Sequence, residues 1–145
     1  MNLRAIAACP LFLAVLLAAG AVGAGGSEQA RRGERAYQKC YSCHALEPGK
    51  SLQGPGLRGI VGGRIAAERG FDYSPALRLL ARRKGRWDSR LLDRFIADPE
   101  AVAPRTSMSF HGIRDRRERA DLIFYLRRVP RYGSSTGSVP TRNEL

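Results

Sequence analysis

The pentapeptide Cys40-Tyr41-Ser42-Cys43-His44 restricts what this chain can fold into more than any other stretch. It has the pattern C-x-x-C-H, which is typical of covalent attachment of a c-type haem. Two thiols at this spacing can add across the two vinyl groups of a porphyrin, and the following histidine can place its imidazole beneath the iron. The motif therefore predicts a domain built around one bound cofactor, haem c, attached through Cys40 and Cys43.

Two other uses of these cysteines fit the pentapeptide alone. A C-x-x-C pair can be a thioredoxin-like dithiol, and cysteine combined with histidine can bind zinc. The chain has no second C-x-x-C pair, because its third cysteine, Cys9, lies in the N-terminal segment. A tetrahedral zinc site would then need a fourth ligand from an acidic side chain or from His111. Haem attachment is favoured, and the zinc and dithiol interpretations stay open on the motif alone.

Residues 1–24 have the features of a secretion signal. Arg4 precedes the apolar segment 11–19, and Val22-Gly23-Ala24 offers the small residues of a cleavage site. An uncleaved membrane anchor is the alternative, and membrane contact is expected only in that case. Export predicts a periplasmic location, where an oxidising environment disfavours a lasting dithiol or zinc role for the cysteines.

The chain is strongly basic, with 25 Lys and Arg against 13 Asp and Glu and a formal net charge of +12. Loss of Arg4 with the leader would reduce this charge to +11. All the basic residues except Lys39, Lys50 and Lys84 are arginine, so a compositional bias explains the charge as well as a function does. Export and the lack of a basic stripe with interleaved aromatics argue against nucleic acid as a partner. The functional interpretation is electrostatic steering onto acidic docking surfaces of protein partners.

The pattern of caps and apolar residues predicts an all-α domain over residues 25–130. Helices are expected from Ser27 to Lys39, from Ser74-Pro75 to about Arg83, from Asp88 to Asp98-Pro99, and from Asp115 to Pro130. Segments 47–70 and 101–113 have no regular period and are expected to be loops, which a small domain tolerates when they wrap a ligand. The tail 131–145 has little apolar content and is predicted to be disordered.

Two features inside these helices predict specific contacts. Gly33 in mid-helix costs about 1 kcal/mol relative to alanine, so a close packing partner is expected. Asp115 and Glu118 have the spacing of a capping box, with Asp in place of the usual Ser or Thr.

A haem iron bound by His44 on one side needs a second ligand for six-coordinate electron transfer, or else stays open to small molecules. Outside the leader, the chain has one methionine, Met108, and one further histidine, His111. Met108 lies in a polar loop segment, where a buried thioether needs a reason, whereas a methionine on a helical stripe is usually core. Met108 is therefore favoured over His111, and thioether ligation would raise the reduction potential relative to two histidines.

Several blocks in the same order resemble the class I c-type cytochromes, specifically the small, single-haem bacterial kind. They are residues 33–39 before the haem motif, 54–57, 70–74, Trp87, 104–110 and 118–126. The resemblance implies a cytochrome c fold of about four to five short helices around one haem, with the first and last helices crossing so that Gly33 contacts Tyr125. It also implies a monomeric single-electron carrier, not an enzyme, that serves respiratory or dehydrogenase redox partners.

The same resemblance implies roles for residues around the haem. His44 and Met108 would be the iron ligands, and the Pro55 carbonyl would accept a hydrogen bond from the His44 ring. Tyr73, Trp87 and Thr106 match positions that hydrogen-bond haem propionates, although Tyr73 and Trp87 could also be ordinary core aromatics. Arg64, which follows an additional glycine, is assigned to the arginine that faces a propionate.

Two departures from the family pattern lie near the predicted second ligand. Phe95 stands where many relatives have a tyrosine near the methionine sulfur, so one hydrogen bond is missing. Arg105 replaces the glycine before Thr106, which predicts strain in the segment that carries Met108. The alternative functions are a haem c protein with a dissociable Met108, acting as a peroxidase-like enzyme or gas sensor, and a basic zinc-dependent interaction protein.

Overall fold

The computed structural model describes residues 21–47 and 49–129, so most of the predicted leader and the whole tail 131–145 lie outside the described residues. The described residues form the helices α1 (Ala21–Tyr37), α2 (Pro75–Lys84), α3 (Ser89–Ala97), α4 (Pro99–Val102) and α5 (Arg116–Arg128). The β pairing found among them is an isolated antiparallel bridge between Arg64 and Arg86. The predicted all-α class is confirmed. Across these residues, no helix is both long enough and apolar enough to cross a membrane.

Helix α1 begins earlier than the sequence predicted. Ser27 was expected to be its N-cap, but the helix starts at Ala21 and Ser27 lies inside it. Gly25 and Gly26 each lower helix stability by about 1 kcal/mol but offer no side chain that competes for backbone hydrogen bonds. The helix also ends at Tyr37 instead of Lys39. Beyond it the backbone continues in tight turns, in which the Cys40 N–H donates to the Tyr37 carbonyl at 2.8 Å.

The other predicted helix starts are confirmed by their caps. The Ser74 hydroxyl accepts from the Leu77 N–H at 3.3 Å, and Asp88 and Asp115 each accept from the N–H three residues later at 2.8 Å. Helix α4 is a correction, because Asp98-Pro99 was expected to end α3 and lead into a loop. Asp98 does end α3, but its side chain also caps α4 by accepting from the Ala101 N–H at 3.0 Å. Pro99 then occupies the first turn of α4, where proline is tolerated.

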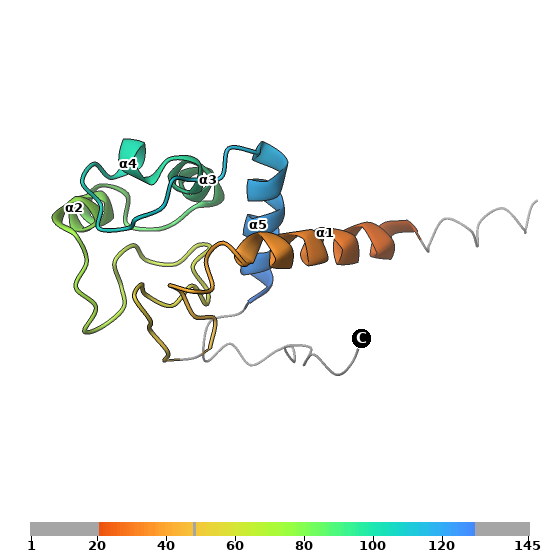
Figure 1. Cartoon of the computed structure of the whole chain (residues 1–145), viewed down its shortest axis with the longest axis horizontal. Coiled ribbons are helices and arrows are strands. Elements are labelled where there is room, and N and C mark those ends of the chain that lie inside the picture. The colour runs from red at the N-terminus through yellow and green to blue at the C-terminus, as the bar shows by residue number, and fades with distance from the viewer. Residues whose placement is uncertain (1–20, 48, 130–145) are drawn as a thin grey trace, which may run out of the picture.

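Helices α1 and α5 cross at one end of the domain, as predicted (Figure 1). In the same view α2, α3 and α4 lie above the loops that follow α1, and α3 is next to α5. Gly33 lies at the crossing: a Cβ there would be 2.1 Å from the Asp121 carbonyl oxygen and 2.5 Å from the Tyr125 Cβ. The contact also carries an ion pair, in which Arg32 Nε donates to the buried Asp121 carboxylate at 2.7 Å. This hydrogen bond holds the pKa of Asp121 below its usual range. Gly33 therefore has the close packing partner that its mid-helix position predicted.

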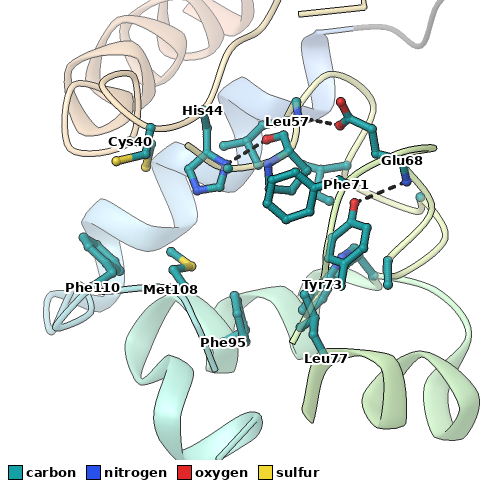
Figure 2. Close-up of a pocket in the computed structure, with 18 of the residues that line it drawn as sticks. Cys40, His44, Leu57, Glu68, Phe71, Tyr73, Leu77, Phe95, Met108 and Phe110 are labelled. Carbon is teal, nitrogen blue, oxygen red and sulfur yellow. Dashed lines mark hydrogen bonds between the residues drawn. The ribbon is translucent and has the colours of Figure 1, made fainter. Parts of the chain in front are cut away.

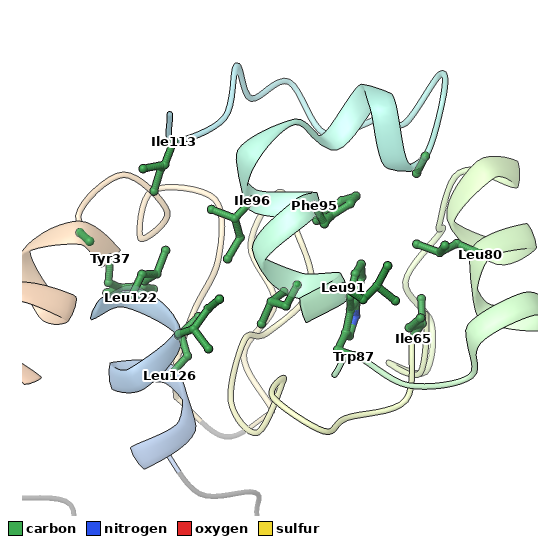
Figure 3. Close-up of a cluster of buried hydrophobic side chains, with 14 residues drawn as sticks. Tyr37, Ile65, Leu80, Trp87, Leu91, Phe95, Ile96, Ile113, Leu122 and Leu126 are labelled. Atoms are coloured by element: carbon green, nitrogen blue, oxygen red, sulfur yellow. The ribbon is translucent and has the colours of Figure 1, made fainter. Parts of the chain in front are cut away.

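A buried hydrophobic cluster joins the crossing to the rest of the domain (Figure 3). Helix α3 contributes Leu91, Leu92, Phe95 and Ile96, and α5 contributes Leu122, Ile123 and Leu126. Arg119 ties the two helices together, because its guanidinium donates to Asp93 at 2.7 Å and to the Ile113 carbonyl at 3.0 Å. Between α3 and the loops that follow α1, the cluster borders a cavity, which is described in the next section.

We predict that Gly33→Ala lowers the free energy of unfolding by about 1–2 kcal/mol, because the cost of overpacking against backbone exceeds the gain in helix propensity. Denaturant unfolding followed by far-UV circular dichroism measures this change. Gly26→Ala is the matched control in the same helix, because nothing lies within 4 Å of a Cβ at that position. It should leave stability unchanged or raise it. Equal effects of the two substitutions would contradict the close approach at Gly33.

Candidate haem site

A cavity of about 830 Å³ lies between the loops that follow α1 and the segment that follows α4. Its volume is within the range of cofactor pockets. It is lined by every predicted site residue: Cys40, Cys43, His44, Pro55, Arg64, Tyr73, Trp87, Thr106 and Met108. Apolar side chains from α2, α3 and the loops complete the wall, including Leu57, Phe71, Leu77 and Phe95 (Figure 2). His111, the alternative second ligand, is exposed and is not among the lining residues.

Three neighbours fix His44, two at its ring and one at its backbone. Its Nδ1 lies 2.8 Å from the Pro55 carbonyl oxygen, which can only accept, so Nδ1 carries the proton in this hydrogen bond. Gly54 lies against the ring, since a Cβ there would be 2.3 Å from Cε1. The Tyr37 hydroxyl donates to the His44 carbonyl at 2.5 Å and so fixes the backbone to the end of α1. With Nδ1 engaged, Nε2 is the nitrogen left to bind a metal.

Cys40 and Cys43 lie in the turns between α1 and His44 as free thiols. Burial, with a smaller contribution from the neighbouring Cys43, raises the pKa of the Cys40 thiol from 9.0 to about 11. A thiol of this kind is protonated at neutral pH, unlike the reactive thiolates of dithiol enzymes. The described residues also contain no group of three or more His, Cys, Asp or Glu side chains arranged to hold a metal ion. The geometry gives the dithiol and zinc interpretations no support.

Met108 lies across the cavity from His44, on the segment between α4 and α5 (Figure 2). The Thr106 N–H donates to the Ala103 carbonyl at 3.0 Å, and the Met108 N–H donates to the Thr106 hydroxyl at 3.4 Å. An imidazole and a thioether that face one another across an apolar cavity are a donor set that haem iron accepts. The residues present therefore fit a haem, with His44 and Met108 in position to bind it.

The backbone at Arg105 is strained, as its replacement of a glycine predicted. Its φ is +63°, in the left-handed region that costs an L-residue roughly 1–2 kcal/mol. The Arg105 N–H donates to the Glu100 carboxylate at 2.8 Å, which holds this conformation in place. Glu100 lies in α4, the helix that the sequence did not predict, so this helix supports the segment that carries Met108.

The remaining predicted residues surround the cavity in different ways. Tyr73 and Trp87 are buried, and the Tyr73 hydroxyl accepts from the Glu68 N–H at 3.2 Å. Trp87 packs on Phe95 with ring centroids 4.9 Å apart, so the missing Phe95 hydroxyl leaves an apolar surface beside Met108. Arg64 is exposed, and its backbone forms the bridge with Arg86, so it lies at the rim of the cavity.

Sequence reasoning missed two residues that line the cavity, Gly54 and Glu68. Gly54 had a signal, because it belongs to a Gly-Pro-Gly segment, although its contact with the His44 ring could not be read from that pattern. Glu68 had no signal, being a single acid in an irregular segment. Its carboxylate accepts from the Gly56 N–H at 2.7 Å and from the Ser51 hydroxyl. Both contacts need the loops of residues 47–70 to fold back on one another.

The fold and site define a class of small helical proteins in which crossed terminal helices and long loops enclose a haem-sized cavity behind a C-x-x-C-H motif. No family model matches the chain. It is 32% identical over 126 residues to cytochrome c2 of Blastochloris viridis, which covers 86% of this chain and 96% of that protein. It is 38% identical over 103 residues to the cytochrome c-type cyt cy of Rhodobacter capsulatus, of which it spans about half the length.

Solved structures show the same likeness. Cytochrome cH from Methylobacterium extorquens superposes with a TM-score of 0.62 at 36% identity, covering 68% of this chain and 97% of that one. Cytochrome c2 from Rhodospirillum centenum superposes with a TM-score of 0.65 at 26% identity, covering 70% and 98%. The chain belongs to the bacterial class I c-type cytochromes, a family of electron-transfer haem proteins.

We predict that Arg105→Gly raises the free energy of unfolding by up to about 1 kcal/mol, because glycine adopts the left-handed conformation without a Cβ penalty. Glycine keeps the N–H that Glu100 accepts. Hydrogen exchange should also slow at the Thr106 and Met108 amides. Ala66→Gly is the control, since Ala66 has a φ of +52° outside the Met108 segment. It should leave exchange at those two amides unchanged, and destabilisation by Arg105→Gly would show that the arginine side chain stabilises the segment.

Stability should fall at alkaline pH through Tyr37. Burial, with a smaller effect from the Glu47 charge, raises the pKa of Tyr37 from 10.0 to about 12. The folded protein thus holds the phenol proton more tightly than the unfolded chain, so stability is lost as pH rises from about 10 to about 12. Unfolding free energies measured across this range should have a shallower slope in Tyr37→Phe. The exposed Tyr41→Phe should keep the wild-type slope, and an unchanged slope in Tyr37→Phe would contradict the assignment.

Proposed function

We propose that this chain is a periplasmic single-electron carrier that holds one haem c covalently through Cys40 and Cys43, with His44 and Met108 as axial ligands. The observation that carries the proposal is the placement of His44 and Met108 on opposite sides of one apolar cavity (Figure 2). A bound haem c would supply a one-electron couple between ferrous and ferric iron. If His44 and Met108 both bind the iron, they would leave no coordination position for a substrate, which fits a carrier and not an enzyme.

The chain's own residues would set the conditions for this electron transfer. The Pro55 carbonyl holds the His44 ring in one tautomer and one orientation. Phe71, Leu77 and Phe95 would exclude water from the haem, which lowers the local dielectric constant. We further propose that Tyr73, Trp87, Thr106 and Arg64 contact the haem propionates. The Tyr73 hydroxyl oxygen accepts from the Glu68 N–H, so the hydroxyl proton of Tyr73 is available to donate to a propionate.

The partners we propose are redox proteins with acidic docking surfaces. We propose that this protein binds them as a monomer. Support comes from the basic composition and from Arg64, an exposed positive residue at the cavity. The partner class we propose is respiratory complexes or periplasmic dehydrogenases.

We also propose a division of the chain into three parts. Residues 1–24 direct export, or anchor the protein in the inner membrane if they are not cleaved. Residues 25–130 form the electron-transfer domain, and residues 131–145 form a disordered tail.

A second function is favoured by one specific observation, the left-handed backbone at Arg105. Strain next to the predicted ligand could let Met108 leave the iron and open a coordination position. The protein would then act on peroxide or bind a diatomic gas. The hydrogen bonds of Arg105 to Glu100 and of Thr106 to Ala103 oppose this opening, which is why the carrier is the preferred function.

Intact mass and the visible spectrum test the proposal on protein made in a host with c-type haem maturation. The wild-type protein should carry one covalent haem, lack the leader, and show a low-spin ferric spectrum with the long-wavelength sulfur-to-iron band. Met108→Ala should lose this band and become high-spin, because the thioether ligand is removed. His111→Ala is the matched control and should keep the wild-type spectrum.

Three other results would each contradict a part of the proposal. A high-spin ferric wild-type protein at neutral pH would favour the enzyme or sensor, with Met108 dissociated. A low-spin wild-type spectrum without the sulfur-to-iron band, unchanged in Met108→Ala but high-spin in His111→Ala, would show that His111 and not Met108 is the second ligand. Stoichiometric zinc without covalent porphyrin mass would identify the cysteines as part of a zinc site.

A further inference from the structure

The peptide group between Pro55 and Gly56 is hydrogen-bonded on both sides (Figure 2). Its carbonyl oxygen lies 2.8 Å from Nδ1 of His44, and its N–H donates to Oε2 of Glu68 at 2.7 Å. This oxygen and this nitrogen belong to one planar, conjugated unit. A single peptide group therefore connects the Glu68 carboxylate to the His44 imidazole.

Such a connection transmits charge. Hydrogen bonds in a chain polarise one another, and a bond to an ionised acceptor is stronger than a bond between neutral groups. A carboxylate at the N–H draws positive charge towards it and increases the negative charge on the carbonyl oxygen at the other end. The Pro55 carbonyl then becomes a stronger acceptor for the Nδ1 proton, which raises the basicity of the imidazole and the donor strength of Nε2.

Glu68 is held in place for this role by two further contacts. The Ser51 hydroxyl donates to its other carboxylate oxygen, and the Glu68 N–H donates to the Tyr73 hydroxyl at 3.2 Å. Both carboxylate oxygens thus act as acceptors, which is the hydrogen-bonding pattern of an ionised carboxylate. The contacts tie the loop around Glu68 to the loop of residues 51–56 on one wall of the cavity.

We propose that Glu68 is a positioning residue that strengthens His44 as an iron ligand through the Pro55–Gly56 peptide, and so lowers the reduction potential of the haem. The inference rests on the proposed function, because it needs haem ligation by His44. A stronger donor stabilises the more highly charged ferric iron relative to the ferrous state. The effect of Glu68 is thus opposite to that of Met108, whose thioether favours the ferrous state.

Spectroelectrochemical titration of the holoprotein tests this with Glu68→Gln. Glutamine keeps the size of the side chain, and its oxygen can still accept from the Gly56 N–H, but the charge is lost. We expect the ferrous-to-ferric equilibrium to shift towards ferrous by about threefold to tenfold, tenfold being 59 mV for one electron. Asp72→Asn is the matched control. It removes the same charge from the same loop, at a side chain that is 94% exposed and paired with Arg78, and it should leave the midpoint unchanged.

Glu68→Asp separates transmission through the peptide from a simple electric field. Aspartate keeps the charge but withdraws the carboxylate from the Gly56 N–H by one methylene. Transmission through the peptide predicts that the reduction potential rises in this variant too, whereas a field acting through space predicts no change. A rise in Glu68→Gln with no rise in Glu68→Asp overturns the proposal.

Nuclear magnetic resonance of the ferrous protein gives a readout independent of the potential. In Glu68→Gln and Glu68→Asp, the His44 Nδ1–H resonance should move upfield, and exchange of the Gly56 amide should accelerate. Asp72→Asn should change neither. Even without the variants, the wild-type protein must show slow exchange of the Gly56 amide, because Glu68 accepts from it. Fast exchange there overturns the proposal even if both Glu68 variants fail to fold.

The outcomes distinguish this inference from the function on which it rests. If haem is attached and low-spin, but the potential and the Nδ1–H resonance do not respond to Glu68, the role of Glu68 is wrong and the electron carrier stands. If the wild-type protein carries no covalent haem, the proposed function fails and the role of Glu68 fails with it.

Discussion

The crossing of α1 and α5 at Gly33 is the contact on which the rest of the structure depends. It brings the helix before the haem motif and the last helix of the domain into backbone contact, with Gly33 against the Asp121 carbonyl. The ion pair between Arg32 and Asp121 reinforces the same point. Because α1 leads directly into the turns that carry Cys40, Cys43 and His44, the crossing also fixes where the cavity begins. The opposite wall is placed by α3, which packs against α5 in the same hydrophobic cluster.

The site is built from segments of different character. His44 is over-determined, since Pro55, Gly54 and Tyr37 each restrict its ring or its backbone. Met108 lies on a segment that includes one strained residue, Arg105, which is held by a single carboxylate from α4. If His44 and Met108 bind the iron as proposed, one ligand is held firmly and the other lies on a strained segment. That balance would decide whether the protein keeps both ligands, as an electron carrier, or opens its iron to small molecules. The hydrogen bonds within the Met108 segment are the feature that favours the carrier.

Membership of the c-type cytochromes fixes the general chemistry but leaves the properties of this member to its own residues. The loop that holds Pro55 is joined to Glu68, and the wall beside Met108 carries Phe95 with no hydroxyl. Under the proposed ligation, the charge of Glu68 would act through His44 and the apolar surface of Phe95 would act beside Met108, on the two sides of the iron. The reduction potential would then depend on contacts that the family motif does not specify.

The sequence by itself determined the local features of this protein. The haem motif, the caps at Ser74, Asp88 and Asp115, and the small residue at the helix crossing could all be predicted, because each depends on chemistry within a few residues or on one conspicuous glycine. The resemblance to a family then supplied the set of cavity residues, and the structure gathers all of them around one cavity.

Tertiary structure decided what depends on how the loops fold back. The short helix α4, the exposed position of Arg64 and the contact of Glu68 with Gly56 had no local signal. A cap is completed by a donor three residues away, whereas the partner of Glu68 lies 12 residues away across an irregular loop. The number of conformations open to such a loop is too large for its sequence to select one, so the packing around the cavity makes the selection.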